Sequence, residues 1–70
     1  MKGGDYMRLY VVSVEGVLRT IRAQNASVAV WCAIEEHINR YNRKPNEVYA
    51  CGYYTKAAHY VPLLDGRKGY

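Results

Sequence analysis

Two strand-like runs separated by only two residues constrain this fold more than any other feature of the sequence. Residues 8–14 (Arg-Leu-Tyr-Val-Val-Ser-Val) and 17–23 (Val-Leu-Arg-Thr-Ile-Arg-Ala) are rich in β-branched and aromatic residues, which favour strands. Glu15 and Gly16 separate the runs, and Gly16 supplies the positive φ that a tight hairpin turn requires. The chain is therefore predicted to begin with a β-hairpin.

Alternation along the second run gives one face to Ile21 and Ala23, which we expect to point inward. Arg19 shares that face, so we expect it at the margin of the sheet. The register of the hairpin remains open at this point, because a slip of one residue would exchange the two faces.

A helix is predicted from residue 26 to residue 42. Asn25 is a suitable N-cap, and Pro45 prevents the helix from continuing. Large apolar residues recur at helical spacing and predict the buried stripe, which consists of Trp31, Ile34, Ile38 and Tyr41.

Two further strands are predicted at residues 47–55 and 59–63, joined by a turn at 56–58. Simple alternation places Val48, Ala50, Gly52 and Tyr54 on one face, and Tyr49, Cys51 and Tyr53 on the other. Gly52 marks either a bulge or a close approach by the helix. Pro62 makes the last strand an edge strand, and residues 64–70 are predicted to form a flexible tail.

The predicted fold class is therefore α+β, with the element order β-β-α-β-β. One helix packs on one face of a small antiparallel sheet, and the opposite face has no second layer. A chain of 70 residues leaves room for one domain, which we place at residues 7–63.

Residues 1–6 have the character of a translated leader. Lys2-Gly3-Gly4-Asp5 back-translates readily to the extended ribosome-binding sequence of a bacterial messenger, and Met7 follows after one codon. We therefore expect the natural chain to begin at Met7 and to come from a bacterium or one of its mobile elements. An ordinary flexible tail is the alternative, and N-terminal mass spectrometry of the natively expressed protein separates the two.

No residue pattern indicates catalysis, a metal site or a cofactor. The adjacent acids Glu35 and Glu36 diverge on a helix and so do not form a converging pair. The potential zinc ligands lack the close spacing of structural zinc sites; they are Cys32, His37, Cys51 and His59. We expect His37 to be a surface imidazole. We therefore expect no enzyme activity, no metal and no cofactor.

Location and redox state follow from what the sequence lacks. No apolar run approaches the ~20 residues that span a bilayer, and the N-terminus has no apolar signal region. Two cysteines are too few for a disulfide-stapled secreted fold. We expect a cytoplasmic protein with free thiols and no membrane contact.

Positive charge gathers at the end of the predicted helix. The chain carries ten Lys and Arg residues against six Asp and Glu residues, a net charge of +4. Four of the basic residues are close in sequence, and they are His37, Arg40, Arg43 and Lys44. This cluster either complements the helix dipole or forms an anion-binding patch that contacts phosphate. Other basic residues, among them Arg22 and Lys56, are scattered along the chain, so the sequence traces no continuous basic stripe.

The aromatic composition of eight Tyr, one Trp and no Phe favours half-buried positions and binding faces. Several tyrosines lie on predicted strands: Tyr10 on the first, and Tyr49, Tyr53, Tyr54 and Tyr60 on the later two. Sheet tyrosines stack on unpaired bases or pack at protein interfaces. The alternative is that about half of the tyrosines complete a thin core. Tyr53 and Tyr54 point to opposite faces, so at least one of them is expected in the core.

The hairpin that closes in Thr-Ile-Arg-Ala-Gln (residues 20–24), followed by an Asn-capped, alanine-bearing helix, is similar to small phage-encoded accessory proteins. Some anti-CRISPR and other anti-defence inhibitors have this build. The resemblance covers residues 7–63 in architecture alone and carries over no site residue.

The leading functional hypothesis is a non-enzymatic phage or bacterial inhibitor that docks on a nucleic-acid-handling protein and blocks it by occupancy. The first alternative is direct DNA or RNA binding, and the second is a homodimeric interaction domain. The expected binding residues are Arg22, His37, Arg40, Arg43, Lys44, Tyr49, Tyr53, Lys56 and Tyr60.

Overall fold

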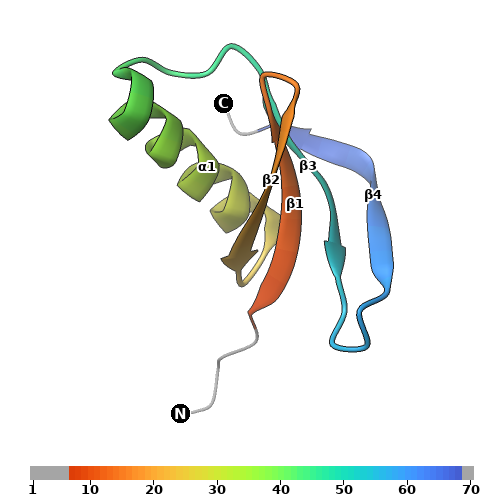
Figure 1. Ribbon diagram of the computed structural model, residues 1–70. Helices are drawn as coiled ribbons and strands as arrows, with labels where there is room; N and C mark the ends of the chain where they lie inside the picture. The colour runs from red at the N-terminus through yellow and green to blue at the C-terminus, as the bar shows by residue number, and fades with distance from the viewer. Residues whose placement is uncertain (1–6, 69–70) are drawn as a thin grey trace.

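A four-stranded antiparallel sheet covered on one side by a single helix makes up the computed structural model (Figure 1). The structure describes the backbone of residues 7–68 and the side chains of residues 7–63. The elements are β1 (Arg8–Val14), β2 (Val17–Ala23), α1 (Ala26–Tyr41), β3 (Val48–Tyr54) and β4 (Tyr60–Lys68). The predicted α+β class is confirmed. The interpretation of residues 1–6 lies outside the described residues.

The sheet has the strand order β2-β1-β3-β4, with β1 and β3 in its interior and β2 and β4 at its edges. The two-residue turn fixes the register of the first hairpin, so Val14 pairs with Val17 and Arg8 with Ala23. Glu15 (φ 50°) and Gly16 (φ 84°) both have positive φ, as the tightest hairpin turns require. The backbone N–H of Glu15 donates to the carbonyl of Glu47 at 2.8 Å, which holds the turn against the chain that enters β3.

The core lies between α1 and the sheet, where Val12, Val30 and Val48 are fully buried. The side chain of Asn25 accepts a hydrogen bond from the backbone N–H of Val28 at 2.9 Å, which confirms the predicted N-cap. Ile21 and Ala23 are buried on the inward face, also as predicted.

The predicted buried stripe of α1 is wrong at two positions. Trp31 is 62% exposed and Tyr41 is 53% exposed, whereas the residues that α1 buries are Ala29, Val30, Ala33, Ile34 and His37. Small Ala29 and Ala33 side chains let the helix backbone approach the sheet closely, and this turns the helix away from the stripe that its largest side chains suggest. His37 is 5% exposed, so the expectation of a surface imidazole is also wrong.

A bulge at Cys51 overturns the simple alternation predicted for β3. Val12 pairs with Ala50 but Val11 pairs with Gly52, so Cys51 is an extra residue in the ladder. Tyr53 therefore lies on the helix side, where it packs against the core. Gly52 and Tyr54 lie on the other side. Gly52 does mark a bulge, but the segment that approaches it closely is β4 rather than the helix.

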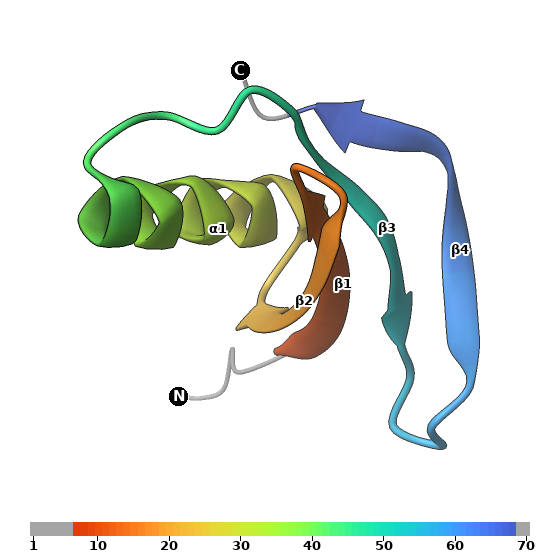
Figure 2. The same ribbon diagram turned by 45° about the horizontal axis from the view of Figure 1, so that its top comes forward.

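β4 continues past Leu63, where the sequence predicted the last strand to end, and reaches Lys68. Beyond an irregularity in the ladder, Arg67 pairs with Ala50 and Lys68 pairs with Tyr49. Figure 2 shows this part of β4 bending back toward the start of β3. The unpaired edge of β3 offers backbone partners that favour this extension, although residues 64–68 lack a strand-like sequence pattern.

Candidate functional site

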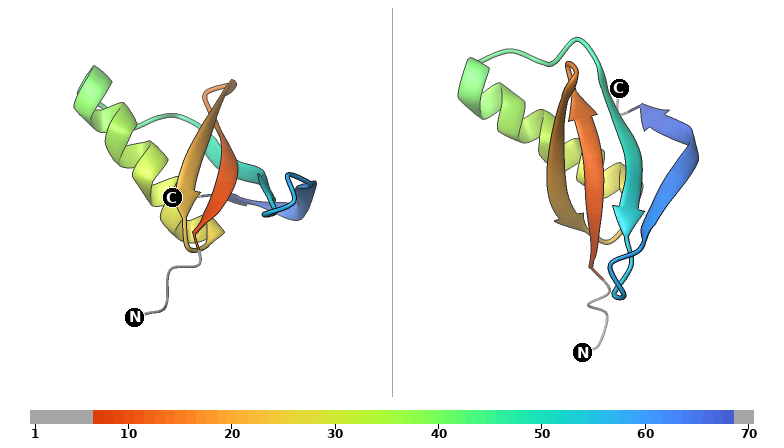
Figure 3. Two further views of the ribbon diagram at one scale, coloured as in Figure 1. Left: turned by 60° about the horizontal axis from the view of Figure 1, so that its bottom comes forward. Right: turned by 45° about the vertical axis from the view of Figure 1, so that its right-hand side comes forward.

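The face of the sheet away from α1 is the principal candidate surface. In the right-hand view of Figure 3 the sheet lies in front of the helix, and no described segment covers it. Directly paired residues of antiparallel strands point to the same face, so one row of side chains crosses all four strands. That row runs through Arg22, Leu9, Tyr54 and Tyr60.

An open groove of about 700 Å³ lies at the end of the sheet where this row begins. We call it the basic groove, and its lining consists of Met7, Arg8, Leu9, Arg22, Tyr53, Tyr54, Thr55, Lys56 and Ala58. Three cations line it: Arg8 comes from β1, Arg22 from β2 and Lys56 from the β3–β4 turn. No acidic residue is part of this described lining.

The ion pairs formed by Glu15 and Glu36 lie away from the two arginines of the basic groove. Within residues 7–63, Glu15 pairs with Arg43 and Glu36 pairs with Arg19. Arg8 places its guanidinium over the ring of Tyr53 at 4.6 Å from the ring centroid, a cation–π contact that leaves the charge in place. Arg8 and Arg22 are both exposed, so they present their positive charge to solvent.

Tyr54 and Tyr60 form an aromatic pair beside the basic groove. Their ring centroids are 5.3 Å apart with an interplanar angle of 60°, and the two residues are 38% and 44% exposed. Tyr60 lies over Gly52, where a Cβ atom would come within 2.5 Å of the phenol oxygen. Burial, together with the nearby Cys51 and Tyr54, raises the pKa of Tyr60 above its ordinary value, so its phenol stays neutral at physiological pH.

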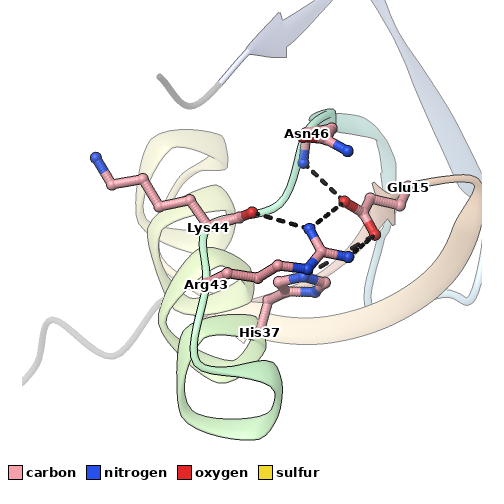
Figure 4. A network of polar contacts seen from close by, with 5 residues as sticks. All are labelled: Glu15, His37, Arg43, Lys44 and Asn46. Atoms are coloured by element: carbon pink, nitrogen blue, oxygen red, sulfur yellow. Dashed lines mark hydrogen bonds and ion pairs between the residues drawn. The ribbon is translucent and has the colours of Figure 1, made fainter.

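The basic cluster predicted at the helix end does not form a single patch. Arg43 donates two hydrogen bonds to the carboxylate of Glu15, at 3.2 and 3.4 Å, and a third to the carbonyl of Lys44 (Figure 4). His37 is buried with its Nε2 atom 4.0 Å from the same carboxylate, and its ring lies 4.6 Å from that of Tyr41. Most of these residues therefore connect the helix end to the first hairpin.

Glu15 is the centre of this connection. Its carboxylate also accepts a hydrogen bond from the backbone N–H of Asn46 at 2.8 Å. That hydrogen bond, followed by the hydrogen bond from Arg43, lowers the pKa of Glu15 below its ordinary value. The arrangement ties the β1–β2 turn to the chain that leaves α1, which is a structural role.

The other residues that the sequence predicted to bind lie in several separate parts of the molecule. Arg22, Tyr53 and Lys56 meet in the basic groove, and Tyr60 lies beside it. Arg40 lies apart, in a shallow hollow shared with Arg19, Glu36 and Asn39. Lys44 is exposed, and Tyr49 is half-buried on the open face opposite Ser13.

Sequence reasoning missed Arg8 and Tyr54 as groove residues. The signal for Arg8 was available, because the two-residue turn pairs Arg8 with Ala23 and Leu9 with Arg22. The two arginines therefore lie at the same end of the sheet, although they alternate between its faces. Tyr54 was hidden by the bulge, which no residue pattern located with certainty.

The described part of the chain contains neither a cluster of metal-ligating side chains nor a helix that could span a membrane. No three His, Cys, Asp or Glu side chains there lie close enough together to hold a metal ion. No helix among residues 7–68 is long and apolar enough to cross a membrane. Cys32 and Cys51 are free thiols.

Comparison with known proteins does not identify a family for this chain. No family model matches the chain, and no curated protein or solved structure matches it.

Proposed function

We propose that this protein is a non-enzymatic nucleic-acid-binding module, which holds a phosphate backbone in the basic groove. The observation that supports this most is that Arg8, Arg22 and Lys56, from three separate elements, line one groove whose described lining contains no acid. The first alternative of the sequence analysis is thus the one that the geometry favours, although at a different place from the helix end.

The chemistry of the groove fits a phosphate backbone. Arginine donates paired hydrogen bonds to phosphate oxygens, and lysine adds a point charge. Tyr53 and Tyr54 supply aromatic surface and phenol groups beside these cations.

The number of phosphate contacts predicts how strongly the binding affinity depends on salt concentration. Three phosphate contacts predict a slope of about −2 to −3 in a plot of log affinity against log salt. Between roughly 50 and 200 mM salt, the affinity should therefore fall by about 20- to 50-fold.

The decisive experiment measures fluorescence anisotropy of labelled oligonucleotides with the full chain and two double variants. We expect Arg8→Ala with Arg22→Ala to weaken binding by at least about tenfold. The matched control, Arg40→Ala with Lys44→Ala, removes the same charge outside the groove and should weaken binding by less than about threefold. Equal losses in both variants would mean that only net charge matters, and no binding by the wild-type protein at low salt would reject the function.

A second candidate function, docking on a protein, is supported by a separate observation on α1. Trp31 is 62% exposed and Val28, three residues earlier on the same face, is 40% exposed. Exposed tryptophan is common at the centre of protein interfaces. This surface suits the proposed phage inhibitor of a nucleic-acid-handling protein. Loss of partner capture from a bacterial lysate on Trp31→Ser, with capture retained by the Arg8/Arg22 double variant, would favour it.

A further inference from the structure

We propose that the nucleic acid bound here is single-stranded, and that its unpaired bases stack on the Tyr54–Tyr60 pair. The inference rests on the proposed function, and it adds a second subsite that is aromatic rather than basic. The juxtaposition that carries it is the side-chain row that crosses the sheet, with Arg22 at one end and the two tyrosines at the other.

The row gives the ligand a path across the strands. Neighbouring strands lie ~4.8 Å apart, so three steps from β2 to β4 cover about 14 Å. Leu9 is the half-buried residue between Arg22 and Tyr54, and it offers apolar surface along the path. A strand whose phosphates lie in the basic groove would therefore carry its next bases over Tyr54 and Tyr60.

The tyrosine pair is held in place by the backbone beneath it. A Cβ atom on Gly52 would come within 2.5 Å of the Tyr60 phenol oxygen and of the Val61 carbonyl. Only glycine leaves room for the Tyr60 ring at this position, and the bulge at Cys51 is what turns Gly52 toward the open face. Tyr54 then supports Tyr60 from the side, at a centroid distance of 5.3 Å.

Exposure and charge both suit stacking. More than a third of each tyrosine remains exposed on a face that no described segment covers. A tyrosine phenol is uncharged at neutral pH, so neither ring repels a neighbouring phosphate. Bases in a duplex are already stacked and paired, whereas unpaired bases offer a free ring face to an aromatic side chain.

The test compares labelled single-stranded and duplex oligonucleotides of about 16 nucleotides, matched in sequence, with the full-length chain. We expect the single strand to bind at least about tenfold more tightly than the duplex. Tyr54→Leu should weaken single-strand binding by roughly 5- to 150-fold. Duplex binding, to which Tyr54 contributes only as part of the groove lining, should weaken by less than about threefold. Tyr54→Phe keeps the ring and should bind like the wild type.

Tyr41→Leu is the matched control, because Tyr41 is an exposed tyrosine on the helix. Tyr60→Leu provides a second test of the pair should Tyr54→Leu fail to fold, as judged by circular dichroism. Equal binding of duplex and single strand, or equal effects of Tyr54→Leu and Tyr41→Leu, would overturn the stacking inference while the groove function stood. No binding of either nucleic acid would overturn both.

Discussion

At the scale of single residues, Gly52 does the most to shape the candidate site. It is buried within β3, and the space where its side chain would lie is occupied by Tyr60 and the Val61 carbonyl. Gly16, by contrast, has open space around it but a φ of +84°. The two glycines are therefore required for different physical reasons, one by packing and the other by backbone conformation.

We predict that Gly52→Ala lowers the free energy of unfolding by about 1–3 kcal/mol, because the new methyl group must displace Tyr60 or separate β3 from β4. Urea denaturation measures this change. Gly16→Ala should also destabilise, by about 1–2 kcal/mol through its left-handed backbone alone. Only Gly52→Ala should also weaken single-strand binding. A Gly52→Ala protein as stable as the wild type would show that Tyr60 does not lie over this position.

At the scale of elements, the orientation of α1 is the feature on which sequence pattern and structure differ most. We predict that Val30→Ala lowers the free energy of unfolding by about 2 kcal/mol, because Val30 is fully buried. Trp31→Ala should cost less than about 1 kcal/mol, although it removes a much larger side chain, because Trp31 is exposed. Chemical denaturation of both variants, followed by circular dichroism, measures the difference. A larger loss of stability in Trp31→Ala than in Val30→Ala would show that Trp31 is buried in the core.

The first hairpin and the helix start could be predicted from the sequence because local rules determine them. A two-residue turn leaves one register, and Asn25 caps the helix with its own side chain. The faces of β3 could not be predicted, because a bulge depends on how β1 and β3 fit together. The extension of β4 depends on pairing with β3 rather than on the residues of β4.

The candidate site, too, depends on contacts between residues that are distant in sequence, and local rules do not predict these contacts. Arg22, Tyr53 and Lys56 were expected to bind, but sequence spacing gave no reason to bring them together, because they come from three parts of the chain. His37 and Arg43 looked like surface charge because their partner, Glu15, is distant in sequence and near only after folding.

At the scale of the whole molecule, Glu15 connects the hairpin turn, the end of α1 and the chain that leads to β3 (Figure 4). Its folded-state pKa lies below the ordinary value of 4.5. The stabilisation is therefore complete above the unfolded-state pKa, and it is lost as the pH falls through the folded-state pKa. Acid should weaken the whole fold through this residue.

We predict that the unfolding midpoint of the wild-type protein falls more steeply below pH 4.5 than that of Glu15→Gln. At neutral pH, Glu15→Gln should be the less stable of the two, because it loses the ion pair with Arg43. Glu35→Gln, which removes an exposed helix acid, should follow the wild-type profile. Urea midpoints measured across the acidic range provide the comparison. Identical profiles for the two variants would exclude Glu15 as the source of the acid sensitivity.

The bulge at Cys51 has a genetic consequence. The ladder between β1 and β3 needs one residue fewer than the chain supplies, since Val11 and Val12 pair with Gly52 and Ala50. An in-frame loss of codon 51 would therefore leave every other pair in register, with Tyr53 toward the helix and Tyr54 toward the open face. Losing a codon elsewhere in β1, or in β3 beyond the bulge, would shift the β1–β3 register by one residue. The shifted side chains would then point to the opposite face of the sheet. The centre of the sheet thus contains a position where the gene tolerates a change in length.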